Sequence, residues 1–361
     1  MRIAQISPLD EAVPPAFYGG TERVVSYLTE ALVDLGHDVT LFASGDSRTR
    51  ARLEAACPRS LRLDPSIRDP LAPHLAMLED VRRRADDFDI LHCHLSYLPF
   101  PLFSELETPF LTTLHGRLDL PEVQSVFDLF PEAAVVSISH SQRRPLPRAN
   151  WLATVHHGVP ENLLTPQPQV QPTYLAFMGR ISPEKRPDLA VEIAARAGLP
   201  LKIAAKVDRA DKAYFETVIE PLLGQPHVEF LGEINDAEKP AFLSGAVALL
   251  FPIDWPEPFG LVMIEAMACG TPVIAFNRGS VPEVIVQGVS GYIVNDVEEA
   301  VRAAAQVHLL SRREVRRQFE GRFTAARMAL RYLDIYTGLT AARRPALLRA
   351  VASSRGHEAS G

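Results

Sequence analysis

Residues 257–276 read EPFGLVMIEAMACGTPVIAF, and they place a loop, a helix and a strand in direct succession. Pro258 and Gly260 favour the loop, and the residues after them favour a helix that ends at Gly270. The apolar run VIAF that closes the stretch has the composition of a buried strand. A helix that leads straight into a buried strand is typical of a parallel sheet with helices on its faces.

Two carboxylates lie eight residues apart in this stretch, Glu257 in the loop and Glu265 in the helix. Glu265 is flanked by methionine, isoleucine and alanine, so its side chain is predicted to lie in apolar surroundings. A carboxylate is costly to bury unless a partner hydrogen-bonds it, which makes Glu265 a candidate ligand contact. The two carboxylates also suggest an acid/base pair, although such a pair must flank one bond and a helix start separates these two.

The alternation of strands and helices extends through the rest of the chain. In the first half, apolar runs such as Arg2–Ile6 alternate with amphipathic segments such as Thr21–Leu35. Pro160–Pro172 is rich in proline and glutamine and has no periodic apolar face, so we place a linker there. The alternation then restarts at Tyr174. The sequence thus predicts an α/β fold with two doubly wound, Rossmann-like domains that face a cleft.

The predicted domain boundaries follow from this linker. Residues 1–165 form the first domain, and residues 172–323 form the second. A helix over Thr324–Thr340, which two tyrosines anchor, either closes the second domain or crosses back onto the first. Residues 341–361 are predicted to form a frayed or partly disordered tail.

The composition is that of an ordinary globular protein, with 47% hydrophobic residues, 22% charged residues and a net charge of −7. The negative charge argues against a nucleic-acid partner, because nucleic-acid-binding domains are usually basic. The apolar runs are too short to span a membrane, and the N-terminus reads directly into a strand. The three cysteines are too widely spaced for a metal site or a disulfide framework. Together these features predict a cytoplasmic protein.

Loops that follow strands are the expected places for a site, because ligands of open α/β sheets bind beyond the carboxyl ends of the strands. Gly19 and Gly20 precede a helix, where free amides favour a phosphate, although an ordinary flexible turn fits them equally. His115 follows a strand and suits a sugar hydroxyl or proton transfer, unless it is simply a polar loop residue. His92 and His94 alternate along another strand end, so that one of them faces the cleft.

Basic residues and a second helix start complete the candidate site. Arg180 and Lys185 lie on a loop after the first strand of the second domain, which suits a diphosphate; the alternative is a solvated basic turn. The amides of Gly260 and Leu261 start a helix and suit an anion in the same way. Gly279–Glu283 is a further glycine turn, for which a structural and a ligand-binding role fit equally.

Together these residues resemble those of the retaining nucleotide-sugar glycosyltransferases of family 4. Glu257 and Glu265 match the pair of glutamates, seven residues between them, that marks the family. Four more pieces follow the family's order, namely Gly19-Gly20, Thr113-Leu114-His115-Gly116, Gly179-Arg180 with Lys185, and Gly279-Ser280-Val281-Pro282-Glu283. Each piece is short, and their joint order from residue 1 to about 340 makes the resemblance specific. It implies the two-domain GT-B fold.

The resemblance also implies how a donor is held. Arg180 and Lys185 would bind the donor diphosphate, and the backbone at Gly19 and Gly20 would contact its distal phosphate. As the nucleoside diphosphate leaves, this basic cluster would stabilise the growing charge on its phosphates. The family generally works without a bound metal, so no cofactor is expected besides the nucleotide sugar.

The remaining implied roles concern the sugars. Glu257 would hold hydroxyls of the donor sugar, beside the backbone of Phe259–Leu261. Glu265 would take the ribose hydroxyls, and His115 would assist transfer near the donor sugar. The implied attack on the front face needs no nucleophile from the protein.

The sequence therefore predicts an enzyme that moves a hexose, with retention, from a nucleotide-diphosphate sugar; a UDP-sugar is favoured by its frequency in the family. The acceptor, a small molecule, a glycan or a lipid, is expected at the short loops of the first domain. Membrane association has no support in an acidic chain without a basic amphipathic stretch, and no signal indicates an oligomeric state. Two alternatives on the same fold are an inert nucleotide-sugar-binding protein and a sugar-nucleotide epimerase.

Overall fold

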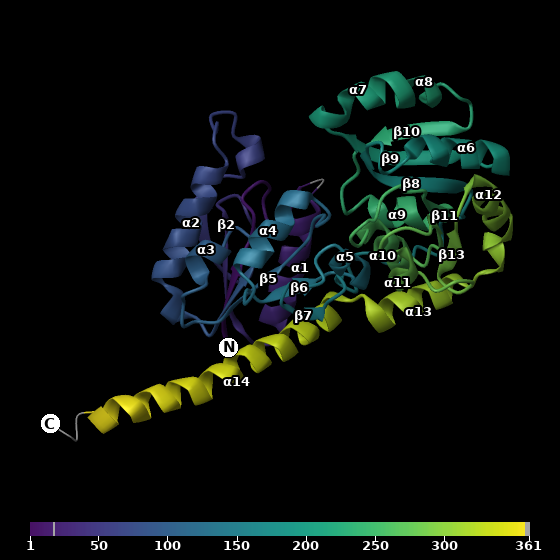
Figure 1. The fold of residues 1–361 in the computed structure, drawn as a ribbon. Helices are drawn as coiled ribbons and strands as arrows, with labels where there is room; N and C mark the ends of the chain where they lie inside the picture. The colour runs from purple at the N-terminus through teal and green to yellow at the C-terminus, as the bar shows by residue number, and fades with distance from the viewer. Residues whose placement is uncertain (17–18, 358–361) are drawn as a thin grey trace.

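The computed structural model describes residues 1–16 and 19–357, with side chains as far as residue 341. Two parallel sheets lie side by side, each between layers of helices, and a long C-terminal helix runs along the first (Figure 1). This is the α/β architecture with two Rossmann-like units that the sequence predicts.

The first sheet has seven strands in the order β3-β2-β1-β4-β5-β6-β7. In chain order, its strands are β1 (Arg2–Ile6), β2 (Asp38–Ser44), β3 (Arg52–Cys57), β4 (Ile90–Cys93), β5 (Phe110–Thr113), β6 (Val135–Ser137) and β7 (Trp151–Thr154). The helices between them are α1 (Gly20–Asp34), α2 (Leu71–Arg83), α3 (Phe100–Phe103), α4 (Pro121–Leu129) and α5 (His140–Arg143). Strands β1 and β4 at its centre are buried on both faces, which explains their continuous apolar runs.

The second sheet has six strands in the order β10-β9-β8-β11-β12-β13. Its strands are β8 (Tyr174–Ile181), β9 (Leu201–Val207), β10 (Val228–Gly232), β11 (Ala246–Phe251), β12 (Val273–Phe276) and β13 (Gly291–Val294). Its helices are α6 (Pro187–Ala197), α7 (Lys212–Tyr214), α8 (Glu220–Leu223), α9 (Lys239–Ser244), α10 (Leu261–Ala268), α11 (Val281–Val284), α12 (Val297–Gln306) and α13 (Arg312–Arg322). Strand β12 has the bounds that the sequence predicts.

Both sheets change direction next to their first strand. In the first sheet β1 lies between β2 and β4, and in the second β8 lies between β9 and β11. Loops at such a switch point diverge and leave a crevice beyond the carboxyl ends of the strands. The glycine loop after β1 and the basic segment at the end of β8 therefore belong to two such crevices, one in each half.

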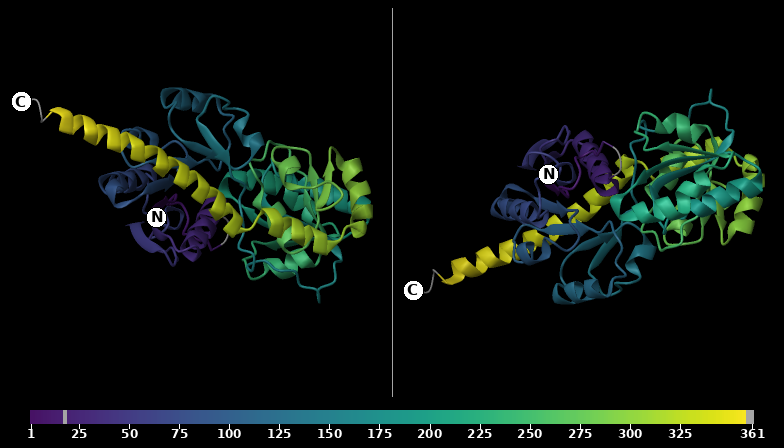
Figure 2. Two further views of the ribbon diagram at one scale, coloured as in Figure 1. Left: turned by 90° about the horizontal axis from the view of Figure 1, so that it is seen from below. Right: turned by 90° about the horizontal axis from the view of Figure 1, so that it is seen from above.

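The chain passes between the two halves twice, and the two passages are hydrogen-bonded to each other. The amide of Val159 donates to the carbonyl of Phe323, and the amide of Ala325 donates to the carbonyl of Val159, both at 2.9 Å. Helix α14 (Ala325–His357) begins here and packs against α1, so it crosses back onto the first half (Figure 2). Both passages thus form one paired hinge rather than two separate linkers.

The structure differs from the sequence-based expectations mainly near the ends of elements. Helix α14 continues to His357, beyond the end at Thr340 that the sequence predicts, and residues 358–361 of the predicted tail lie outside the described residues. Strands β3, β7 and β13 lack a clear alternating or continuous apolar pattern, and the sequence did not indicate them. Among the described residues, no helix combines the length and the apolar character needed to cross a bilayer.

Candidate functional site

A cavity of about 550 Å³ opens between the two halves, and residues of both halves line it. Every site residue that the sequence predicts lies on its wall. They are Gly19, Gly20, His115, Arg180, Lys185, Glu257, Phe259, Gly260, Leu261 and Glu265. Residues that are more than two hundred positions apart in the sequence thus meet at one place.

The second-domain wall is charged, and its centre is an ion pair between Lys185 and Glu257. The indole nitrogen of Trp255 donates to the same carboxylate oxygen, Oε2 of Glu257, at 2.6 Å. The Lys185 ammonium also lies 5.5 Å from the centre of the Trp255 ring and 5.6 Å from that of Phe251. The aromatic rings and the carboxylate together hold the ammonium in the cavity wall.

Arg180 occupies a different element from the one predicted. The sequence places it in a loop, but β8 pairs with β9 as far as Ile181, so Arg180 lies within the strand. Its register partner on β9 is Lys206, and both side chains line the cavity. Like charges side by side on two strands repel each other. Asp211, whose carboxylate lies 3.3 Å from Nε of Arg180, offsets part of that repulsion.

The buried carboxylate of Glu265 has a partner that the sequence did not reveal. Nζ of Lys239, at the start of α9, lies 2.7 Å from Oε1 of Glu265 and 3.0 Å from Oδ1 of Asp236. Asp236 in turn pairs with Arg23 of α1, so that the charges connect the two halves. Glu265 is 3% exposed and Lys239 is 8% exposed, and burial without this pairing would be strongly unfavourable.

Two glycines shape the loop that carries Glu257. Gly260 has φ of 81° and caps α10, and a Cβ there would lie 2.9 Å from atoms of Phe251 and Met263. Gly279 also has positive φ, 53°, and a Cβ there would collide with the backbone of Glu257. The glycine turn at 279 therefore presses directly on the loop and supports its shape, which is a structural role.

The first-domain wall begins with the glycine pair. Gly19 caps α1 and Gly20 is its first residue, so the free amides of this 15-residue helix open at the cavity. Glu22 in the first turn lines the cavity as well, and burial raises its pKa to about 7. The helix start suits an anion, and the raised pKa of Glu22 weakens the competition of its carboxylate with that anion.

Two histidines, His115 and His157, also belong to the first-domain wall. Nε2 of His115 lies 2.9 Å from Nδ1 of His94, and its ring stacks on that of His157 with the centres 5.2 Å apart. Burial lowers the pKa of His115 to about 3 and holds the pKa of His94 and His157 well below the usual value. These rings are therefore neutral at physiological pH and serve as hydrogen-bonding groups.

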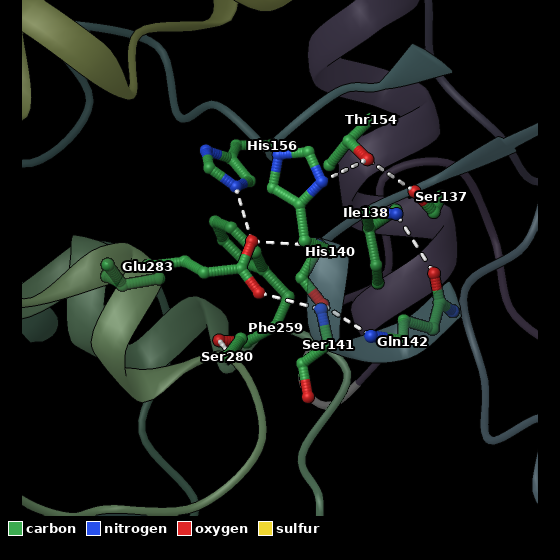
Figure 3. A network of polar contacts seen from close by, with 12 residues as sticks. Ser137, Ile138, His140, Ser141, Gln142, Thr154, His156, Phe259, Ser280 and Glu283 are labelled. Carbon is green, nitrogen blue, oxygen red and sulfur yellow. Dashed lines mark hydrogen bonds and ion pairs between the residues drawn. The ribbon is translucent and has the colours of Figure 1, made fainter. Parts of the chain in front are cut away.

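A carboxylate from the second half fastens the two halves beside the cavity. Glu283 accepts hydrogen bonds from the amides of His140 and Ser141, at 2.7 and 2.8 Å, and from Nε2 of His156 at 3.2 Å (Figure 3). Burial raises the pKa of Glu283, but these hydrogen bonds outweigh it and leave the pKa below its usual value. Since Glu283 is not among the residues that line the cavity, its contacts point to a structural role.

Sequence reasoning missed several residues of the cavity wall. Lys239, Glu22 and Arg23 lie on helices, at positions where their charge alone predicts a solvated face. The sequence does carry one signal for these residues. Their neighbours in the sequence are strongly apolar, so the helices that carry them have few solvent-exposed positions. Among the described residues, no cluster of three or more His, Cys, Asp and Glu side chains has the arrangement of a metal site.

Residues 18–165 match the family model described as Glycosyltransferase Family 4, and residues 165–322 match the one described as Glycosyl transferases group 1. The chain belongs to glycosyltransferase family 4. This confirms the resemblance that the paired glutamates and the glycine loop suggest, and it makes the protein a glycosyltransferase.

Relatives and solved structures agree with this assignment. A phosphatidyl-myo-inositol mannosyltransferase of Mycolicibacterium smegmatis is 28% identical over 359 residues, which cover 89% of this chain and 88% of that protein. The sucrose-phosphate synthase of Thermosynechococcus elongatus superposes with a TM-score of 0.75 at 22% identity, over 95% of this glycosyltransferase and 100% of that chain. HepE of Anabaena, solved in complex with UDP and glucose, superposes with a TM-score of 0.73 at 18% identity. The match covers 94% of this chain and 100% of that one. The two structures show the shared GT-B fold.

Proposed function

We propose that this glycosyltransferase transfers a hexose from a nucleotide-diphosphate sugar with retention of the anomeric configuration. The observation that carries the proposal is the composition of the cavity between the halves. The cavity brings together two helix starts, a basic cluster and two buried carboxylates, and its volume suits a small ligand.

The basic cluster and the helix starts favour a diphosphate. Arg180, Lys185 and Lys206 line one side of the cavity, and the free amides of α1 and α10 open toward it. Negative charge grows on the phosphates as the nucleoside diphosphate leaves. Cations and amides that are already in place stabilise this charge more in the transition state than in the ground state.

The two carboxylates favour hydroxyl groups. Glu257 is oriented by Lys185 and Trp255 and is proposed to accept hydrogen bonds from the donor sugar. Glu265 is oriented by Lys239 and is proposed to accept them from the ribose. Because partners already engage both carboxylates, neither is well suited to act as a free nucleophile or as one half of an epimerase acid/base pair. This supports front-face transfer, which needs no nucleophile from the protein.

The acceptor is proposed to enter from the first-domain side. A second hollow of about 300 Å³ adjoins the cavity and shares Asp10, Thr21 and His115 with it. Its other lining residues include His74, His94 and Ser96, which offer polar groups for a hydroxylated acceptor. The mannosyltransferase relative suggests an inositol-bearing acceptor as the first class to test.

A thermal-shift panel tests the donor assignment. UDP, GDP, ADP and their hexose derivatives are added to the full chain, with UDP-glucose first because HepE was solved with UDP and glucose. A nucleotide at about 100 times its Kd stabilises the fold by about 2.7 kcal/mol, which raises the melting temperature by a few degrees. Glu265→Gln should reduce the shift, whereas Glu298→Gln, on an exposed ion pair outside the cavity, should leave it intact. No shift with any nucleotide would contradict the proposal.

The anomeric outcome tests the retaining mechanism. Proton NMR during slow donor hydrolysis, or during transfer to an inositol-bearing acceptor, reports which anomer forms first. The proposal expects the configuration of the donor. An inverted product would contradict it, and nucleotide binding without any turnover over a broad acceptor set would favour an inert binding protein.

A further inference from the structure

A file of buried polar side chains leads from the cavity through the first domain to α14. It begins with His115 and His94, whose facing nitrogens are 2.9 Å apart. Nε2 of His94 lies 2.8 Å from Oε1 of Gln5, and Nε2 of Gln5 lies 3.1 Å from the hydroxyl of Tyr336. These residues come from β1, the ends of β4 and β5, and the crossing helix. Neither Gln5 nor Tyr336 lines the cavity.

The amide oxygen of Gln5 fixes the proton of His94. A carbonyl-type oxygen only accepts, so Nε2 of His94 carries the hydrogen. Burial and the neighbouring histidines keep the pKa of His94 far below neutral, so its ring is neutral and its Nδ1 is a bare lone pair. Nε2 of His115 must then donate to that lone pair. Nδ1 of His115 is consequently also bare, and it is buried without a hydrogen-bond partner among the described residues.

The other half of the file continues in the same direction. Gln5 donates to Tyr336, whose hydroxyl lies 2.6 Å from Nδ1 of His92 and donates to it. His92 then donates from Nε2 to Thr113 at 2.7 Å, and Thr113 donates to Tyr332 at 2.8 Å. Each group in the file thus uses one donor and one acceptor, and all the bonds run away from the cavity.

Such a file has two self-consistent states, because reversing one bond reverses the rest. In the reversed state the Gln5 amide is turned over, His94 donates from Nδ1, and His115 carries its hydrogen on Nδ1. His115 would then offer a donor to the cavity in place of an acceptor. The orientation of the Gln5 amide, which Tyr336 holds, therefore decides what His115 presents to a substrate.

We propose that Gln5, His94 and Tyr336 are positioning residues that keep the hydrogen of His115 on Nε2, so that Nδ1 accepts a hydrogen bond from a substrate hydroxyl. This deepens the proposed function and rests on it. Since Tyr336 belongs to α14, the crossing helix sets the polarity of a group in the cavity. Positioning of this kind requires a hydroxyl opposite His115; a phosphate or carbonyl oxygen there would face a lone pair.

The tautomer of His115 is measured directly by NMR on full-length protein labelled with 15N-histidine. Two-bond couplings distinguish a ring protonated on Nε2 from one protonated on Nδ1, and the signal of His115 is assigned by its loss in His115→Gln. The wild type is expected to carry the hydrogen on Nε2. Tyr336→Phe removes one hydroxyl without changing shape, frees the Gln5 amide to turn, and should give a mixture of the two tautomers.

Two further variants sharpen the result. Gln5→Leu removes the acceptor for His94 and should also mix the tautomers of His115. Gln5→Glu keeps an acceptor at that position, so it should restore the single Nε2 tautomer while its charge raises the pH at which His115 titrates. Tyr174→Phe is the matched control, because it also removes a buried tyrosine hydroxyl, bonded at 2.7 Å to the carbonyl of Phe242, in the other domain. It should leave the spectrum of His115 unchanged.

Donor hydrolysis provides the functional readout. Tyr336→Phe is expected to lower kcat about fivefold, the effect of losing one oriented hydrogen bond, with a donor KM within about twofold. Tyr174→Phe should change neither value. A wild-type His115 with its hydrogen on Nδ1, or a Tyr336→Phe protein with the wild-type tautomer and kcat, would overturn the inference.

Failure of the proposed function is distinguishable from failure of this inference. The tautomer is read in the protein without nucleotide, so a negative thermal-shift panel would leave the NMR result standing. Conversely, clear nucleotide binding and turnover together with the reversed tautomer would remove the positioning role alone.

Discussion

The two walls of the cavity use opposite means to present polar groups. The second-domain wall is charged, with Lys185 paired to Glu257 and Lys239 paired to Glu265. The first-domain wall also carries the ionisable side chains of Asp10, Arg23 and Arg62, but its histidine His115 is an uncharged hydrogen-bonding ring backed by His94. Ion pairs hold Lys185 and Lys239 in the second-domain wall. A chain of hydrogen bonds that all run in one direction holds His115 in the first-domain wall.

The difference indicates how the two walls divide the work. A diphosphate carries fixed negative charge, so its site needs cations. Ion pairs within the wall hold such cations in place, shielded from solvent. A sugar carries hydroxyls, which need donors and acceptors of defined polarity, and an imidazolium at the same place would attract the phosphates instead. In the proposed function, the cations of the second domain hold the diphosphate, and the neutral ring of His115 meets a hydroxyl group.

The largest effect is expected from the charged wall. Lys185→Met removes the proposed diphosphate contact and leaves the buried carboxylate of Glu257 without its ion partner. Removing one group that stabilises transition-state charge costs about 10²–10³ in rate, so kcat/KM for donor hydrolysis should fall up to about a thousandfold. Lys212→Met is the control, since Lys212 pairs with Glu216 on the surface outside the cavity. A Lys185→Met enzyme within tenfold of the control would remove Lys185 from the site.

The buried histidines at and behind the first-domain wall should make the stability of the protein depend on pH. The pKa values of His92, His94, His115 and His157 are far below their value of about 6.5 in the unfolded chain. Below that pH the unfolded chain binds protons that the folded protein does not, so the free energy of unfolding falls as the pH falls. Each of the four contributes about 1.4 kcal/mol between about pH 7.5 and 5.5, which is about 5.5 kcal/mol together.

Urea unfolding at both pH values measures this loss of stability. His94→Gln should reduce the pH-dependent difference by about one quarter, because one of four such histidines is gone. His308→Gln, at an exposed position, should leave the difference at the wild-type value. Equal stability of the wild type at both pH values would show that these buried histidines are not held neutral.

The smallest effect is expected where the two walls are fastened together. Glu283→Gln removes the charge that accepts from the amides of His140 and Ser141, and stability near neutral pH should fall by about 1–2 kcal/mol. Because the pKa of Glu283 is lowered in the fold, its contribution is present above about pH 4.5 and is lost as the pH falls through the folded pKa.

Chemical unfolding across pH separates this effect from that of a surface charge. The gap between wild type and Glu283→Gln should close in acid, since both then carry a neutral side chain. Glu298→Gln is the surface control and should cost less than about 0.5 kcal/mol. A gap that stays constant down to acid pH would assign the loss to shape rather than to the carboxylate.

Much of the fold and of the candidate site was predictable because it depends on local pattern. Helix α6 (Pro187–Ala197) and strand β12 (Val273–Phe276) have the predicted bounds. The spacing of apolar residues and the flanking glycine and proline residues indicate these bounds. Most residues predicted for the site come together because they lie at strand ends, in the loops that follow or in the first turns of helices, beyond the carboxyl ends of two sheets that meet at the cavity. Arg180 was assigned to a loop because its charge interrupts an apolar run, although the backbone ladder continues through it.

The partners of these residues were not predictable in the same way. Glu265 looked like a carboxylate awaiting a ligand, and Lys239, 26 residues earlier, already neutralises it. The turn at Glu283 fitted a ligand role and a structural role equally, until its contacts with His140 and Ser141 decided for the structural one. Such pairings join side chains from separate elements, so no spacing within one element reports them.

By itself, the sequence determined the family, the paired α/β architecture and the residues of one cavity, because periodicity, punctuation and motif spacing are properties of short segments. Only the tertiary structure decided the electrostatics of that cavity. Burial makes His94 and His115 neutral, a glutamine on β1 gives their hydrogens a direction, and Tyr336 brings the crossing helix into the same file. These properties arise from low dielectric and from contacts over more than 300 residues, as between Gln5 and Tyr336, which exist only once the chain has folded.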